Sequence, residues 1–160
     1  MTAPRLVIGI GNPSRGDDAL GPACIEGLEA LAPPHTELLT DFQLQVEYLL
    51  DLAGRREVIF VDADAAGPAP FRFAPVAASG GPACTTHAVP PGDILAAYHR
   101  HYGTPPPASH VLAIRGYCFD LGAPLSGAAA ANLEAALAFL AQRLAADPGT
   151  DTAAAPQGPR

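Results

Sequence analysis

Carboxylate side chains follow the two most strongly apolar segments of the chain. Asp17 and Asp18 come shortly after residues 6–10, and Asp62 and Asp64 close the segment 57–64. Carboxylates are common ligands of metal ions, and they can also accept a proton from water during hydrolysis. These four residues are therefore the first candidates for a chemical role.

An imidazole is available in the loop Cys84-Thr85-Thr86-His87, which follows a stretch rich in glycine and proline. Two carboxylates and one imidazole form an incomplete ligand set for a nickel- or zinc-like ion, with positions left open for another ligand. Each residue also has a simpler interpretation. Asp17 or Asp18 fits a helix cap, Asp62 a loop-positioning residue and His87 a hydrogen-bonded surface histidine.

The pattern of apolar residues predicts the elements that position these side chains. Expected strands span residues 6–10, 36–41, 57–64, 71–76 (at an edge) and 109–116. Expected helices span residues 19–31, 44–53 and 93–102, with a long last helix that Ser126 caps. This alternation predicts an α/β three-layer sandwich: a twisted, mostly parallel sheet of about five strands with helices on both faces. We expect one domain over residues 1–146 and a disordered tail over residues 147–160.

The expected architecture locates the site. In open parallel sheets, ligands bind at the carboxyl ends of the strands, near the point where the strand order reverses. If the strands 6–10 and 57–64 are neighbours, Asp18 and Asp62 converge on one edge of the sheet.

Composition narrows the function further. A net charge of −7 argues against nucleic acid as a partner. All nine basic residues are arginine, which excludes a Schiff-base lysine and the lysine of a phosphate-binding P-loop. The three cysteines have no Cys-x-x-Cys spacing and fit free thiols in a reducing compartment. The first apolar run is too short for a signal peptide or a membrane helix, so we expect a cytoplasmic protein that does not bind membranes.

Competing motifs have little support. The segment Gly9-x-Gly11-x-x-Ser14 lacks the third glycine of a dinucleotide-binding loop, and Asp17 and Asp18 would repel a pyrophosphate. The signatures Gly-x-Ser-x-Gly and His-Glu-x-x-His are both missing. Cys84 and His87 lie in one loop, which is a poor arrangement for a thiol nucleophile and its base.

Several segments together resemble the family of hydrogenase maturation proteases. Gly9-Ile10-Gly11-Asn12-Pro13, followed by Gly16-Asp17-Asp18-Ala19-Leu20-Gly21-Pro22, is similar to the N-terminal signature of that family. The segment 58–63 resembles its aspartate-bearing strand, and Thr86-His87 resembles its histidine loop. The last strand and helix also fit, so the resemblance covers about 140 residues.

The resemblance implies an endopeptidase that removes a short C-terminal extension from the large subunit of nickel–iron hydrogenases. Carried over by position, the metal-contacting and catalytic residues are Asp18, Asp62 and His87, with Asp17 in a supporting or capping role. The nickel would arrive with the precursor, and no organic cofactor is implied. Where the family often has Asp-Gly-Gly, this chain has Asp41-Phe42-Gln43-Leu44-Gln45, which leaves open which hydrogenase is processed.

Two readings from other classes stay open at this point. One is a non-catalytic module that binds a nucleotide or a metal ion on the same fold. The other is a nickel chaperone of hydrogenase assembly, which would use the same ligands and leave the precursor uncut.

Overall fold

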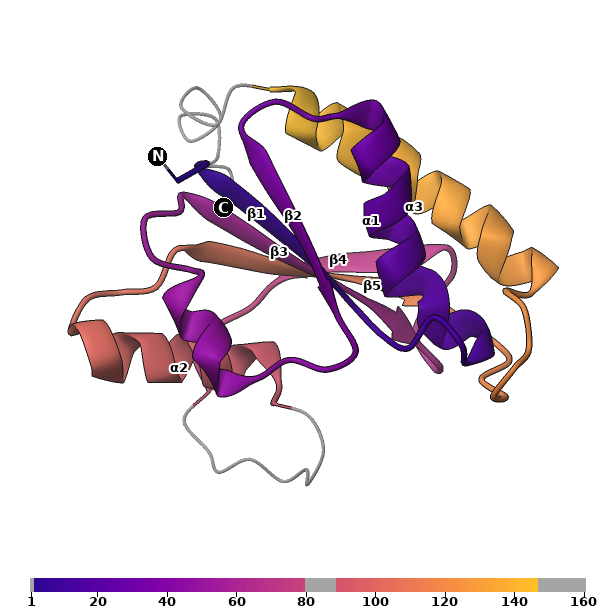
Figure 1. The fold of residues 1–160 in the computed structure, drawn as a ribbon, viewed down its shortest axis with the longest axis horizontal. Coiled ribbons are helices and arrows are strands. Elements are labelled where there is room, and N and C mark those ends of the chain that lie inside the picture. The colour runs from indigo at the N-terminus through magenta and orange to yellow at the C-terminus, as the bar shows by residue number, and fades with distance from the viewer. Residues whose placement is uncertain (1, 80–88, 147–160) are drawn as a thin grey trace.

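The computed structural model describes residues 2–79 and 89–146. Its centre is a five-stranded sheet in the order β2-β1-β3-β5-β4 (Figure 1). The strands are β1 (Arg5–Ile10), β2 (Thr36–Asp41), β3 (Glu57–Asp64), β4 (Phe71–Pro75) and β5 (Ala108–Arg115). The first three and β5 are parallel, whereas β4 runs antiparallel to β5 at the edge. The sequence-based prediction of a mostly parallel sheet is confirmed.

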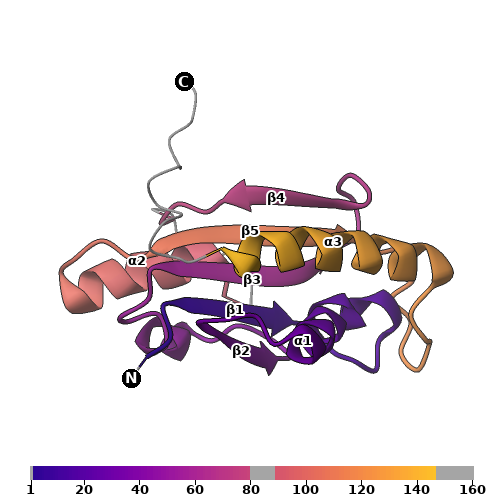
Figure 2. The same cartoon turned by 90° about the horizontal axis from the view of Figure 1, so that it is seen from above.

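Helices cover both faces of this sheet. The helices are η1 (Gly16–Ala19), α1 (Leu20–Leu31), η2 (Val46–Leu50), α2 (Pro91–Tyr102) and α3 (Gly127–Ala145), of which η1 and η2 are 3₁₀ helices. In Figure 1, α1 and α3 lie above the strands and α2 lies below them, and the view from above has α1 and α3 in front of the strands (Figure 2). The three-layer arrangement follows from the strands, which are buried on both faces and need cover on both.

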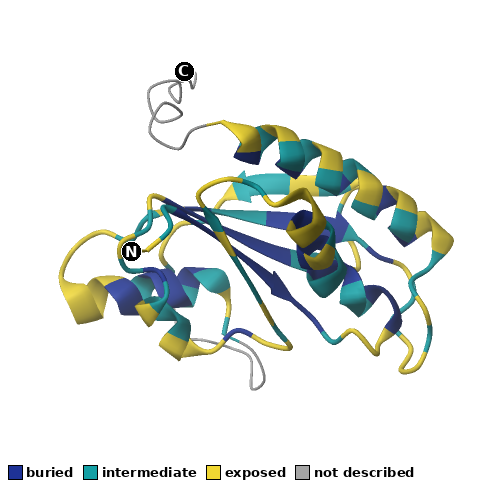
Figure 3. Cartoon of the chain, turned by 45° about the horizontal axis from the view of Figure 1, so that its top comes forward, coloured by how far each residue is buried: buried dark blue, intermediate teal, exposed yellow. Residues whose placement is uncertain are grey.

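Alternating side chains of the central strands divide the core into two clusters. Val7 and Ile59 point to the face of α1 and α3, whereas Ile8 and Phe60 point to the face of α2. All four side chains are at most 1% exposed. The central strands are accordingly the most deeply buried part of the molecule (Figure 3).

Helix α1 lies very close to β1 because both contribute glycine at the crossing. A Cβ atom on Gly9 would collide with the carbonyl oxygen of Gly21, and one on Gly21 with the carbonyl oxygen of Ile10. This close approach fixes where the connection between β1 and α1 runs. That connection carries Asp17 and Asp18.

Two sequence-based predictions of helices need correction. The expected helix 44–53 is only the short 3₁₀ helix η2, because Gln45 is extended and Leu50 is exposed. The expected helix 19–31 is confirmed as α1, which starts at Leu20 directly after η1. Helix α2 starts at Pro91 rather than Asp93, with proline in its first turn, where a missing N–H costs nothing. The expected tail 147–160 lies outside the described residues.

In the described part of the chain, no helix is long and apolar enough to cross a membrane.

Candidate active site

The strand order reverses between β1 and β3. From β1 the chain passes through α1 to β2 on one side, whereas β3 leads through later elements to β5 on the other. The connections that leave the carboxyl ends of these two adjacent parallel strands therefore run in opposite directions, and open α/β sheets bind ligands at such a point. Asp18 follows β1 here, and Asp62 lies near the end of β3. Because β1 and β3 are neighbouring parallel strands, these two carboxylates lie at the same edge of the sheet, as the sequence predicts.

The loop that follows β1 contacts Asp18 closely. The backbone N–H of Asn12 donates a hydrogen bond to Asp18 Oδ2 at 2.7 Å. Gly11 has a φ of +148°, and a Cβ atom there would collide with the carbonyl oxygen of Asp18. The Asn12 side chain in turn accepts a hydrogen bond from the N–H of Ser14 at 2.9 Å. The glycine thus allows a turn that brings Asp18 back onto the end of β1.

Asp17 points away from this edge and into the protein. Its side chain is fully buried and accepts hydrogen bonds from the backbone N–H groups of Tyr117, Cys118 and Ser126, at 3.0 Å or less. The Ser126 hydroxyl donates a fourth at 2.8 Å. Burial acts to raise the pKa of Asp17, but these hydrogen bonds outweigh it and lower the pKa below the ordinary value of 3.8. Asp17 is therefore an ionised structural group that holds the loop between β5 and α3.

The environment of Asp62 shifts its pKa in the direction opposite to that of Asp17. Burial raises its pKa to about 7, against a hydrogen bond from the N–H of Ala63 that acts to lower it. The negative charges of Asp18 and Asp64 raise the pKa further. A carboxylate in such a place favours a bound proton or a cation, and it changes protonation near neutral pH. Perturbed carboxylates of this kind are typical of catalytic and metal-binding sites.

Solved structures with a similar fold include hydrogenase maturation proteases. No protein-family model matches this sequence, and no curated protein matches it significantly. The chain superposes on the hydrogenase maturating endopeptidase HybD from E. coli with a TM-score of 0.66 and 26% identity, over 85% of this chain and 88% of that one. An endopeptidase from Escherichia coli gives a TM-score of 0.64 and 27% identity, over 87% and 91%. The chain is similar to the hydrogenase maturation proteases in fold and, at about a quarter of its positions, in sequence.

The fold match extends to an archaeal protein of the same kind. The [NiFe] hydrogenase maturation protease HycI from Thermococcus kodakarensis KOD1 has a TM-score of 0.72 and 24% identity, over 89% of this chain and 92% of that one. The α/β fold of this peptidase is thus matched over most of its length by solved hydrogenase maturation proteases.

His87, the third predicted site residue of the protease, lies outside the described residues, as does Cys84. Val89, two residues beyond His87 in the sequence, is described, and its N–H lies 3.5 Å from the carbonyl oxygen of Leu44. Val89 and Asp62 line one pocket. Within residues 2–79 and 89–146, no three His, Cys, Asp or Glu side chains are grouped closely enough to hold a metal ion. The three-ligand set therefore stays a prediction.

Other residues singled out in the sequence have structural roles. Asp64 accepts hydrogen bonds from the N–H groups of Ala66 and Gly67 and so closes the turn after β3. His110 stacks on Phe73 with ring centroids 4.7 Å apart, far from the carboxyl edge at the start of β5. The helix caps considered for Asp17 and Asp18 are wrong, since neither side chain caps η1 or α1.

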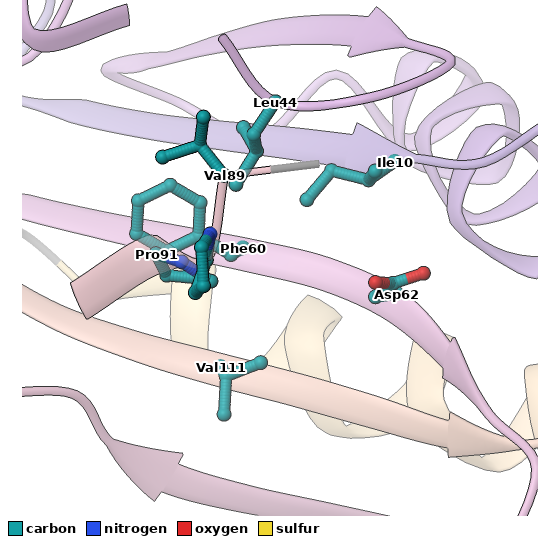
Figure 4. A pocket seen from close by; sticks show the side chains of 8 residues that line it. Ile10, Leu44, Phe60, Asp62, Val89, Pro91 and Val111 are labelled. Atoms are coloured by element: carbon teal, nitrogen blue, oxygen red, sulfur yellow. The ribbon is translucent and has the colours of Figure 1, made fainter. Parts of the chain in front are cut away.

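The protease also has an apolar pocket beside Asp62 that sequence reasoning missed. It has a volume of about 300 Å³ and lies between the sheet and the start of α2 (Figure 4). Its wall comes from Ile10, Leu44, Phe60, Val89, Pro90, Pro91 and Val111. These residues come from three strands, two loops and the first residue of α2, so only the alternation of side chains on the strands could have indicated a shared face.

Proposed function

We propose that this chain is the endopeptidase that removes the C-terminal extension of a nickel-loaded hydrogenase large-subunit precursor. The main support for this proposal is that Asp18 follows β1 and Asp62 lies near the end of the neighbouring strand β3, at the point where the strand order reverses. There the charge of Asp18 raises the pKa of Asp62. The family of the chain gives the reaction class, since its relatives are named as hydrogenase maturation proteases.

Nickel enters this proposal as part of the substrate. Asp18, Asp62 and His87 would bind the nickel that is already loaded in the precursor. A cation placed between the carboxylates offsets their repulsion and favours the ionised form of Asp62. A precursor without nickel offers no such cation, so its binding and cleavage would fail together. The arrangement would act as a checkpoint on metal loading.

The bond cleavage itself requires an activated water molecule. The substrate's metal would lower the pKa of this water, or a carboxylate would accept its proton, and the water oxygen would attack the scissile carbonyl carbon. The C–N bond then breaks, and the proton passes to the leaving nitrogen. A pKa of about 7 suits Asp62 to this proton transfer near neutral pH.

The test is incubation with a nickel-loaded large-subunit precursor, followed by mass measurement of its C-terminus. We expect a product shortened at the C-terminus with the nickel-loaded precursor and none with the nickel-free form. Asp62→Asn and Asp18→Asn should each reduce cleavage at least 100-fold, on the scale of losing a general base. The matched control is Asp120→Asn, which removes an exposed carboxylate from another loop and should cleave normally.

The same experiment separates the alternatives. A nickel chaperone would leave the precursor uncut, and full activity of Asp62→Asn would contradict the assignment of that residue. A nucleotide-binding module has weaker support because the N–H of Asn12, which a phosphate would need, already donates to Asp18.

A further inference from the structure

The pocket beside Asp62 has a fixed apolar floor. Phe60 is fully buried, Leu44 is 3% exposed and Ile10 is 8% exposed, so the core holds each of them in place. Phe60 and Asp62 are two residues apart on β3 and point to the same face of the sheet. Asp62 at the charged end of the pocket and Phe60 in its apolar floor are therefore held by one strand, as Figure 4 shows.

The size of the pocket limits its occupant. A volume of about 300 Å³ is at the lower end of the range for small-molecule sites, which is roughly 300–1,000 Å³. It holds one large side chain of a peptide, whereas a nucleotide needs more room and polar groups to bind its phosphates.

The chemistry of the wall limits the occupant further. Among the described residues, Asp62 is the one charged group that lines the pocket, and it would repel an anionic ligand. The remaining seven lining residues are apolar, so a polar side chain would lose its hydrogen bonds to water and gain none. The charge of Asp62 disfavours an acidic side chain, and the apolar wall favours an apolar one.

We propose that this pocket receives one apolar side chain of the substrate polypeptide, at or next to the scissile bond, and selects the substrate by the size of that side chain. This inference rests on the proposed function, which places the scissile bond at Asp62. Consecutive residues of an extended peptide are about 3.3 Å apart, so a side chain that reaches the pocket belongs to a residue flanking that bond. Val111 on β5 forms the wall opposite Ile10, and it sets the width of the pocket.

The test measures kcat/KM for a panel of nickel-loaded precursors. Each residue flanking the cleaved bond is changed in turn to Ala, Leu, Phe or Asp. We expect one position at which Asp abolishes cleavage and at which shortening a large apolar side chain costs about 10-fold or more, as for methylene groups in other apolar pockets. The other positions should tolerate all four residues.

Two variants of the protease complete the test. Val111→Phe narrows the pocket and should shift the preference at that position towards Ala by at least 10-fold. Val111→Ala widens it and should shift the preference towards Phe. A variant that is only less stable would lose activity equally on all substrates, so the ratio between substrates reports the pocket. Val46→Phe changes an exposed valine on η2 and serves as the matched control with an unchanged ratio.

The outcomes distinguish the two proposals. The pocket proposal is wrong if wild-type cleavage does not depend on the size of the flanking side chains. It is also wrong if both Val111 variants keep the wild-type ratio of kcat/KM between substrates. Either result leaves the proposed function intact. No cleavage of any nickel-loaded precursor by the wild type overturns the proposed function, and the pocket proposal with it.

Discussion

Ser126 donates two hydrogen bonds to the buried carboxylate of Asp17, one from its N–H at 2.7 Å and one from its hydroxyl at 2.8 Å. The same hydroxyl accepts a hydrogen bond from the N–H of Ala129 and so caps α3. Two residues that are 109 positions apart thus join the loop that carries Asp18 to the start of the last helix. The two adjacent aspartates therefore have different roles: Asp17 is buried and holds the structure together, whereas Asp18 lies at the carboxyl edge of the sheet.

Removal of the Asp17 carboxylate should destabilise the protein. Asp17→Ala leaves three backbone N–H groups without their acceptor, and we expect a loss of about 3 kcal/mol in the free energy of unfolding. Asp17→Asn keeps one acceptor oxygen and should lose less. Urea unfolding at pH 7 measures both. Because the pKa of Asp17 is lowered, its contribution is present above pH 3.8 and is lost as the pH falls through the folded pKa.

The control for Asp17 is Asp120→Ala, which removes an exposed carboxylate and should change stability by less than about 0.5 kcal/mol. Equal stability of Asp17→Ala and the wild type would show that water replaces the carboxylate without cost, contrary to its assigned role.

Gly11→Ala should impair cleavage more than stability. Alanine is strained at a φ of +148°, at a cost of about 1–3 kcal/mol, and its Cβ would push the backbone of Asp18 out of place. We therefore expect at least a tenfold loss of cleavage in a protein that still folds, measured on the nickel-loaded precursor. Gly103→Ala is the control, because Gly103 also has a positive φ but a Cβ atom there meets nothing within 4 Å. Matching activities for the two variants would argue against this role of the turn.

Charged groups at the amino end of the sheet should matter for stability alone. Arg5 is 1% exposed, and its Nε lies 3.3 Å from Glu57 Oε1, while Arg143 Nε donates to Glu57 Oε2 at 3.0 Å. Glu57→Ala leaves the Arg5 charge buried without this carboxylate, and we expect a loss of about 3–5 kcal/mol. The matched control is Glu29→Ala, which removes an exposed carboxylate from α1 and should change stability by less than about 0.5 kcal/mol.

Thermal unfolding and precursor cleavage, measured on the same samples, check the Glu57 prediction. Cleavage at a temperature where Glu57→Ala is folded should equal that of the wild type, because Glu57 is at the opposite end of β3 from Asp62. A large loss of cleavage in the folded variant would show that the two ends of the strand are coupled.

The sequence predicts the sheet well because its signal is local. Residues 57–64 and 36–41 are strands as expected, since a continuous or alternating apolar run is visible within a few residues. The expected helix 44–53 fails because its apolar residues serve different purposes. Leu44 and Leu52 enter the core, while Val46 and Leu50 are exposed, so no single helix face is buried.

In the candidate site, too, residues could be predicted only where the pattern that places them is local in the sequence. Asp18 and Asp62 can be predicted because strand ends and a known topology rule place them at one edge. The role of Asp17 cannot, because its hydrogen-bond donors lie 100 or more residues away in the sequence. The apolar pocket is likewise assembled from three strands, two loops and the start of α2, and it depends on how these elements pack together.

Asp62 should give the wild-type protein a pH-dependent stability that Asp62→Asn lacks. Burial first, and then the charges of Asp18 and Asp64, raise the folded pKa to about 7 from the ordinary 3.8. A raised pKa means that the folded state favours the protonated group, so this contribution is fully present below pH 3.8 and is lost as the pH rises through about 7. Asparagine cannot ionise, and the variant should therefore gain up to about 4 kcal/mol relative to the wild type between pH 4 and pH 8.

Urea unfolding of both proteins without nickel, at pH values from 4 to 8, measures this gain. Asp18→Asn should reduce the pH dependence because it removes one of the two charges that raise the pKa of Asp62, whereas Asp120→Asn should leave it unchanged. A difference between Asp62→Asn and the wild type that stays constant across this range would mean that Asp62 titrates at its ordinary pKa. Addition of nickel-loaded precursor should then shift the titration of Asp62 downward, because a bound cation stabilises the ionised carboxylate.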